Sequence, residues 1–274
     1  MRAMTAPALS AYPRLMKTGV AAAALLAFLG LTPGAGAESV DLLLVLAADV
    51  SRSIDEGEFD LQRKGYAAAL TDPRVLAAIH GGAHQAIAVA FVEWAGAGEE
   101  KVVVDWTVIR DAEGAETAAA TMLSAPRSFV GRTSISGAID FAMERLAAAP
   151  AAGDRRIIDI SGDGTNNSGR DLALARGAAL AQGVTINGLA IINDRPNPGY
   201  AFHTQPPGGL PQWYRQNVIG GPGAFLLVVE DFSSFADAMT NKLVSEIAAL
   251  SPAQPCISQR CAATSSFRLA KRKS

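Results

Sequence analysis

Segments of strand type alternate with alanine-rich segments of helix type along most of the chain, and this alternation is the strongest constraint on the fold. The strand-type runs are residues 40–48, 85–96, 101–109, 155–161, 184–192 and 224–230. The helix-type runs are residues 58–70, 73–79, 111–125, 134–149, 170–183 and 231–250. This order predicts a doubly wound α/β fold, with a mostly parallel central sheet and helices on both faces.

The second and third strand-type runs follow each other with no helix between them. A short link rich in glycine, within residues 95–100, joins them. Two strands connected so closely form a hairpin, because a parallel pair needs a long crossover. We therefore expect one antiparallel edge strand in the sheet.

The first 37 residues have the layout of a secretory signal peptide. Arg2, Arg14 and Lys17 precede the apolar run GVAAAALLAFLGL, and a small-residue site ending at Ala37 follows. This run is shorter than the roughly 20 residues that a membrane-spanning helix requires. We expect cleavage after Ala37 and a periplasmic or secreted protein, with no stable membrane insertion after cleavage.

Residues 38–250 are of a length that suits one large α/β domain. Within it, residues 193–223 are rich in Pro, Gly and aromatic residues, which predicts a long irregular insertion with one short helix near LPQWYRQNV. Residues 251–274 are expected to form a tail. The two cysteines of the chain, Cys256 and Cys261, predict a small disulfide loop there in an oxidising compartment.

Charge is unevenly distributed along the chain. Residues 38–255 contain 26 acidic and 16 basic residues, a formal balance of −10, whereas residues 256–274 contain five basic residues and no acidic one. An acidic body argues against nucleic acid as the main partner, because the phosphate backbone attracts basic surfaces. The basic tail is expected to be a solvated end of the chain.

Oxygen-bearing side chains cluster at three places in the sequence. Asp49, Ser51 and Ser53 follow the first strand-type run, Thr133 precedes a helix, and Asp163 follows the strand-type run at 155–161. Ligands of doubly wound sheets bind beyond the carboxyl ends of the parallel strands, so these five residues should meet at one edge. Two carboxylates and three hydroxyls are hard oxygen donors that suit Mg²⁺ or Mn²⁺. The sequence therefore predicts a metal site.

Capping is the simpler interpretation of the same residues. Ser53 and Glu56 have the spacing of a capping box, in which a serine and a glutamate satisfy the first backbone amides of a helix. Thr133 can cap the helix that starts at Ser134, and Asp163 followed by glycine is a common turn pair. Both interpretations stay open at this stage, and capping does not exclude ligation.

Three other charged residues belong to the same loops or to strands of the predicted sheet. Arg52 stands inside the Asp49–Ser53 segment, where it would either crowd the site or attract an acidic ligand. Glu93 lies near the carboxyl end of its strand-type run. It is either a residue that supports the site or its specificity, or simply a charged residue of the hairpin. Asp159 lies inside a strand that should be buried, so we expect it to be a structural carboxylate paired with a neighbour.

The histidines give weaker signals. His80 and His84 flank a Gly-Gly-Ala segment that interrupts the helix a zinc-binding pair would need, so we expect both at the surface. His203, Trp213 and Tyr214 lie in the insertion, where they either form a partner surface or anchor the loop.

The pattern Asp49-x-Ser51-x-Ser53, followed by Thr133 and Asp163-Gly164, resembles the metal-ion-dependent adhesion site (MIDAS) of von Willebrand factor type A (vWA) domains. The resemblance covers about residues 40–250. It implies that Ser51, Ser53 and Thr133 bind the ion directly, while Asp49 and Asp163 act mainly through water. The stretches FVEWAGAGE, TSISGAIDFA, DISGDGTNN and NVIGGPGAFL are similar to an uncharacterised group of exported bacterial proteins within that superfamily.

The resemblance implies an exported binding module in which Mg²⁺ (or Mn²⁺) holds a carboxylate from a partner protein. Neutral hydroxyl ligands leave the ion with uncompensated positive charge, which an acidic group would complete. A metal-dependent hydrolase acting on phosphate or similar anions is the alternative, and a purely structural protein with capped helices is a third possibility. The chain contains no G-x-S-x-G, H-E-x-x-H or P-loop motif, so we expect no enzyme.

Overall fold

The first strand-type run forms β1 (Glu38–Asp49), the strand about which the computed structural model is organised. Every residue from Leu42 to Asp49 is buried. β1 pairs in parallel with β2 (Ile87–Trp94) on one side and with β4 (Ala151–Gly162) on the other. The sequence of a strand that is covered on both faces is a continuous apolar run, because neither side of the strand faces water.

The structure describes residues 37–192, 201–230 and 232–248. The predicted signal peptide lies outside these residues, except for Ala37. Cys256 and Cys261, with their predicted disulfide, and the basic tail also lie outside them. Among the described residues, no helix combines the length and the apolar character needed to cross a membrane.

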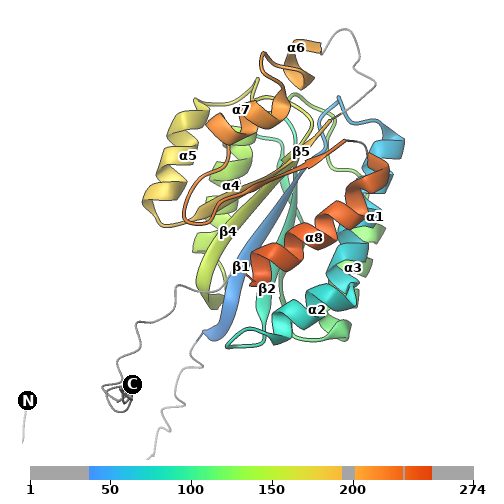
Figure 1. The fold of residues 1–274 in the computed structure, drawn as a ribbon, viewed down its shortest axis with the longest axis vertical. Helices are drawn as coiled ribbons and strands as arrows, with labels where there is room; N and C mark the ends of the chain where they lie inside the picture. Colours follow the sequence, from blue (N-terminus) through green and yellow to red (C-terminus); the bar gives the residue numbers. More distant parts are fainter. Residues whose placement is uncertain (1–36, 193–200, 231, 249–274) are drawn as a thin grey trace, which may run out of the picture. The chain divides into compact units, whose positions relative to one another are not determined.

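The sheet has six strands in the order β3-β2-β1-β4-β5-β6 (Figure 1). The other three strands are β3 (Glu100–Ile109), β5 (Thr185–Ile191) and β6 (Leu226–Val229). β3 runs antiparallel to β2 at one edge, and all other neighbours are parallel. The predicted fold class and the edge hairpin are confirmed. β4 begins at Ala151, ahead of the predicted residue 155, because its first residues pair with the start of β1 at Glu38.

Helices cover both faces of the sheet (Figure 1). One face carries α1 (Glu56–Thr71), α2 (Pro73–His80), α3 (Ala112–Ser124) and α8 (Phe235–Ala248), the last preceded by the short helix η2 (Phe232–Ser234). The other face carries α4 (Ile135–Ala147), α5 (Leu172–Ala181) and α7 (Leu210–Asn217). α7 is the short helix predicted in the insertion. A second one, α6 (Ala201–Thr204), was not predicted.

A buried charged cluster fastens α8 to the sheet. Lys242 of α8 has a fully buried side chain, and its Nζ lies 2.8 Å from Oδ1 of Asp159 on β4. Lys242 also pairs with Glu246 one turn further along the helix. The expectation that Asp159 is a structural, paired carboxylate is confirmed. Burial, followed by the negative charge of Asp159, raises the pKa of Glu246 to about 7.

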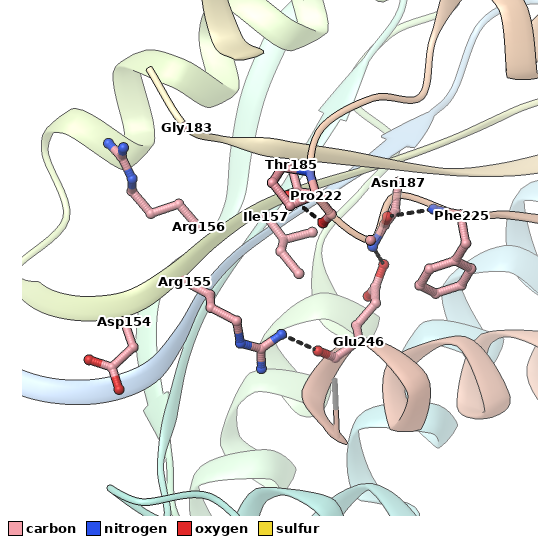
Figure 2. Close-up of a pocket in the computed structure, with 11 residues that line it drawn as sticks. Asp154, Arg155, Arg156, Ile157, Gly183, Thr185, Asn187, Pro222, Phe225 and Glu246 are labelled. Atoms are coloured by element: carbon pink, nitrogen blue, oxygen red, sulfur yellow. Dashed lines mark hydrogen bonds between the residues drawn. The ribbon is translucent and has the colours of Figure 1, made fainter. Parts of the chain in front are cut away.

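A cavity of about 480 Å³ lies beside this cluster (Figure 2). Several polar groups at its wall form hydrogen bonds within the protein. Asn187 donates to Glu246 Oε1 at 2.8 Å, and the Arg155 guanidinium donates to the main-chain oxygens of Glu246 and Ile247 at 2.6 and 2.9 Å. These contacts tie the end of α8 to β4 and β5, which gives the cavity wall a structural role.

Replacing Lys242 by methionine should unfold the protein more easily. The substitution leaves Asp159 and Glu246 as uncompensated buried carboxyl groups, and breaking such a pair typically costs about 3–5 kcal/mol in the free energy of unfolding. Urea denaturation followed by circular dichroism at neutral pH measures the effect. The control is Lys64→Met, which breaks an exposed pair with Asp60 and should change stability by less than about 1 kcal/mol. Equal losses in the two variants would contradict the proposed role of the cluster.

Candidate metal centre at the carboxyl edge of the sheet

The five predicted oxygen-bearing residues meet beyond the carboxyl ends of β1 and β4. The Asp49 carboxylate accepts the Ser51 amide at 2.7 Å, and the Ser53 hydroxyl donates to Asp163 Oδ1 at 2.7 Å. The hydroxyl oxygens of Ser51 and Ser53 are 3.1 Å apart. The Thr133 hydroxyl donates to Ser51 Oγ at 3.3 Å. Residues 114 positions apart in the sequence therefore form one connected group of oxygen atoms.

Arg127 joins the two loops that carry most of these oxygens. Its Nη2 lies 2.8 to 2.9 Å from the main-chain oxygens of Val50, Ser51 and Ile54, so it donates to the loop that follows β1. Arg127 itself belongs to the loop that leads to Thr133. One guanidinium can satisfy several carbonyl groups because its donors are arranged as a rigid fork. No motif of the sequence indicated this role, since Arg127 belongs to none.

Two consecutive asparagines position the loop of Thr133 against the loop that follows β4. Asn167 Oδ1 accepts the Thr133 amide at 3.0 Å, and the Asn167 amide donates to the Thr133 carbonyl at 2.9 Å. Asn166 Oδ1 accepts the Ser136 amide at 3.0 Å. The pair directly after Asp163-Gly164-Thr165 was visible in the sequence, but its partners lie on a distant segment.

The capping interpretation of Ser53 and Thr133 is wrong. Asp55 caps α1, and it forms the capping box with Glu58. Ser134 caps α4 by accepting the Gly137 amide at 3.1 Å. Each helix begins after the hydroxyl in question, so that hydroxyl can turn toward the site instead of toward the helix.

Glu93 is neither exposed nor a plain hairpin charge. Its side chain is buried, pairs with Arg63 of α1 and accepts the Ser128 amide at 2.9 Å. Ser128 follows Arg127 in the loop that leads to Thr133. Glu93 therefore supports the site by holding the loop that leads to Thr133 in place.

The electrostatics of the site are unfavourable for the protein alone. Asp49 is fully buried, and burial together with the charge of Asp163 raises its pKa well above the usual value. Its Oδ2 is buried and has no hydrogen-bond partner among the described residues. The buried Tyr214 hydroxyl also has none there, and burial and the charge of Asp49 raise its pKa. Buried carboxylates of this kind are stabilised by a cation.

The oxygen group fits a hard divalent ion. Mg²⁺ and Mn²⁺ prefer carboxylate and hydroxyl oxygens, and Mg²⁺ keeps several waters. The unpartnered Oδ2 of Asp49 provides an acceptor for such a water. The hydroxyls of Ser51, Ser53 and Thr133 would contact the ion, and the carboxylates of Asp49 and Asp163 would balance its charge.

His203 is the site residue whose role the sequence did not reveal. It comes from α6 in the insertion, and its Nε2 lies 2.9 Å from the Thr133 hydroxyl oxygen. Its Nδ1 lies 3.0 Å from Thr165 Oγ1. Burial and the charge of Arg132 lower the pKa of His203 to about 4, so the ring is neutral near pH 7. The contacts with Thr165 anchor the insertion, as one of the two expectations for His203 had it, and the contact with Thr133 also joins His203 to a candidate ligand.

A cavity of about 230 Å³ opens next to these residues. It is lined by Arg52, Ser53, Gly131, Arg132, Thr133, Asn167 and His203. Two arginines place positive charge at this opening, although residues 38–255 as a whole carry a formal balance of −10. The opening therefore favours an anionic group over a cationic one.

Several solved structures share this fold. The proximal thread matrix protein 1 of the mussel byssus aligns with a TM-score of 0.56 and 16% identity, over 77% of this chain and 48% of that one. A second structure of it, with a zinc-occupied MIDAS motif, aligns with a TM-score of 0.51 and 18% identity, over 77% and 48%. A von Willebrand factor type A protein from Catenulispora acidiphila aligns with a TM-score of 0.53 and 16% identity, over 76% and 43%. The fold is thus that of vWA domains.

The pilus adhesin SpaC of Lactobacillus rhamnosus GG, in its open conformation, shares this fold with a TM-score of 0.54 and 14% identity, over 76% of this chain and 30% of that one. The chain thus spans less than half of the length of each of these proteins. A search of curated proteins gave no match. The chain belongs to the DUF1194 family, described as proteins of unknown function, whose model matches residues 39–251.

Replacing Asp49 by asparagine should stabilise the metal-free protein. Asparagine keeps an acceptor for the Ser51 amide but removes a buried charge that faces Asp163. We expect a gain on the order of 1 kcal/mol in the free energy of unfolding, as is common when a strained functional residue is replaced. Urea denaturation in the presence of a chelator measures it. Asp60→Asn, on an exposed side chain, is the control and should have almost no effect. A less stable Asp49→Asn variant would show that the carboxylate supports the fold without metal.

Proposed function

We propose that this protein is an exported binding module of the vWA type that holds an acidic group of a partner protein through a bound Mg²⁺ or Mn²⁺ ion. The observation that carries the proposal is the buried Asp49 carboxylate, whose Oδ2 has no hydrogen-bond partner among the described residues. Asp163 and the hydroxyls of Ser51, Ser53 and Thr133 surround it with further oxygens.

The shared fold supports the class of function. One relative by fold is a pilus adhesin, and another is a matrix protein whose MIDAS motif has been seen with zinc. The oxygen-only group of this chain favours harder ions than zinc, because zinc is bound mainly by nitrogen and sulfur in proteins. Export rests on the leader pattern of residues 1–37.

The partner group would enter through the cavity at Arg52 and Arg132. Hydroxyl ligands carry no charge, so a bound ion keeps a net attraction for an anion. The two arginines add positive charge at the same opening and can form charge-assisted hydrogen bonds with a carboxylate. An acidic side chain of a protein partner is therefore the ligand we assign to this opening.

His203 orients a metal ligand in this proposal. His203 Nδ1 accepts the Thr165 amide at 3.1 Å, so the neutral ring carries its hydrogen on Nε2 and donates it to the Thr133 hydroxyl oxygen. That oxygen keeps one lone pair for the ion. The other ring nitrogen contacts Thr165, which fixes the ring. Groups that hold a metal ligand in this way commonly contribute 10- to 100-fold to metal affinity.

Calorimetric titration of Mg²⁺ or Mn²⁺ into the chelator-treated protein should give saturable binding of about one equivalent. The double variant Ser51→Ala/Ser53→Ala should lose it, because two of the three neutral ligands are removed. An acidic partner, captured in the presence of Mg²⁺ and released by chelator, should likewise not bind the double variant.

Two results would count against the proposal. Absence of metal binding even with added carboxylate would leave the five oxygens as a purely structural group. Turnover of a generic phosphoester by the wild type, lost in Asp163→Ala, would instead support the alternative of a metal-dependent hydrolase acting on anions.

His203→Ala should weaken Mg²⁺ binding by about 10- to 100-fold and leave the fold intact. The loss arises because the Thr133 hydroxyl is no longer held in one orientation. Calorimetry gives the affinity, and thermal unfolding in chelator reports the stability without metal. His80→Ala is the matched control, since His80 is exposed and lies at the end of α2. A metal affinity that does not change in His203→Ala would limit His203 to anchoring the insertion.

A further inference from the structure

A second group of candidate metal ligands lies at the opposite end of β1. Asp41 stands near the start of β1, His84 in the loop between α2 and β2, and Asp154 near the start of β4. One ligand atom from each of them lies within 4.8 Å of the other two. Asp41 and Asp49 are eight residues apart on an extended strand, or roughly 26 Å. This group is therefore separate from the site proposed above.

The Asp41 carboxylate is held in place by the backbone of the loop that carries His84. The amides of His84 and Ala86 donate to its two oxygens at 2.9 and 3.3 Å. A Cβ at Gly82 would lie only 2.1 Å from Asp41 Oδ2, so the loop packs directly on the carboxylate. A carboxylate has about four acceptor positions, so these two amides leave lone pairs for a metal ion. Such outer contacts are the usual way in which proteins orient a ligand.

The spacing of the His84 and Asp154 side chains fits two ligands of one ion. His84 Nε2 and Asp154 Oδ2 are 3.3 Å apart, longer than the roughly 2.7–2.9 Å of a charge-assisted hydrogen bond. Zinc binds nitrogen and oxygen ligands at about 2.0–2.2 Å, which places neighbouring ligands of a tetrahedral site about 3.3–3.5 Å apart. The expectation that His84 is a plain surface residue is therefore too simple, and its side chain is only one-third exposed.

One cation, Arg155, lies near this group: the charges of Asp41 and Asp154 both raise its pKa, while burial lowers it. Arg155, the residue after Asp154, donates from Nη1 and Nη2 to the main-chain oxygens of Glu246 and Ile247. Figure 2 shows the Asp154 carboxylate pointing away from the Arg155 guanidinium, which is directed toward the end of α8. Both carboxylates of the trio can thus contribute negative charge to a bound ion.

We propose that Asp41, His84 and Asp154 bind a divalent transition-metal ion, with Zn²⁺ as the ion whose ligand set they match. One imidazole nitrogen with two carboxylate oxygens is a zinc-type set, whereas Mg²⁺ prefers oxygen ligands alone. The side chain of Asp154 is about half exposed, so solvent can supply a fourth ligand. The bound ion would join the start of β1, the loop at residues 81–86 and the start of β4.

Zinc titration of the untagged full chain tests this site, with the Ser51→Ala/Ser53→Ala variant as background. The background removes zinc binding at the other edge of the sheet, so the two proposals fail or succeed independently. We expect about one equivalent of Zn²⁺ by calorimetry and a rise in the unfolding temperature. Adding His84→Ala should weaken zinc binding at least tenfold. His80→Ala, a histidine near the same loop, should leave it unchanged.

Three outcomes would overturn the assignment. Zinc fails to bind the background variant, zinc binds equally well after His84→Ala, or Mg²⁺ competes with zinc at equal concentration. If His84→Ala does not fold, Asp154→Asn gives the same test at a half-exposed position, where the fold should tolerate the change. A visible absorption spectrum of bound Co²⁺ that disappears in this variant would report the ligand directly.

Discussion

The burial of a carboxylate at the end of the central strand is the constraint on which the rest of the site depends. β1 has strands on both sides and helices on both faces, so its last residue, Asp49, leaves the sheet without contact with water. Asp163, which follows β4, lies at the same edge, and its charge makes the ionisation of Asp49 still less favourable. Hydroxyl groups from two loops stabilise part of this buried negative charge through hydrogen bonds. The remaining negative charge is the reason why we propose a cation as the occupant of this site.

The surrounding loops keep this unfavourable group together. Arg127 fastens the loop after β1, and Asn167 fastens the loop of Thr133. Glu93 holds that second loop from within the sheet by accepting the Ser128 amide. On the face of the sheet that carries α8, Lys242 ties this helix to Asp159, so stability is supplied away from the site. The two tasks are thus separated in space. Lys242 pairs with Asp159 and Glu246 away from the site, whereas at the site burial and the charge of Asp163 raise the pKa of Asp49. Natural proteins often concentrate unfavourable interactions at functional sites in this way.

Much of the architecture could be predicted from local patterns. The alternation of strand-type and helix-type runs indicated the sheet, its edge hairpin and α7, because these elements bury one face or both and their residues record it. The start of β4 was predicted too late, since its first residues are polar or small and become strand only by pairing with β1. α6 was not predicted either, because a four-residue helix is too short to show periodicity.

The residues of the candidate site also fall into two groups, those that local patterns indicated and those that they did not. Asp49, Ser51, Ser53, Thr133 and Asp163 could be found because a rule about parallel sheets places their loops at one edge. His203, Arg127 and Asn167 could not, because each acts on a segment tens of residues away through a contact that leaves no local pattern. The same holds for Asp41, His84 and Asp154, which lie on three separate segments. The sequence by itself determined the elements and which of them end in oxygen-bearing residues. Only the tertiary structure decided which side chains face each other, because such contacts depend on how distant segments pack.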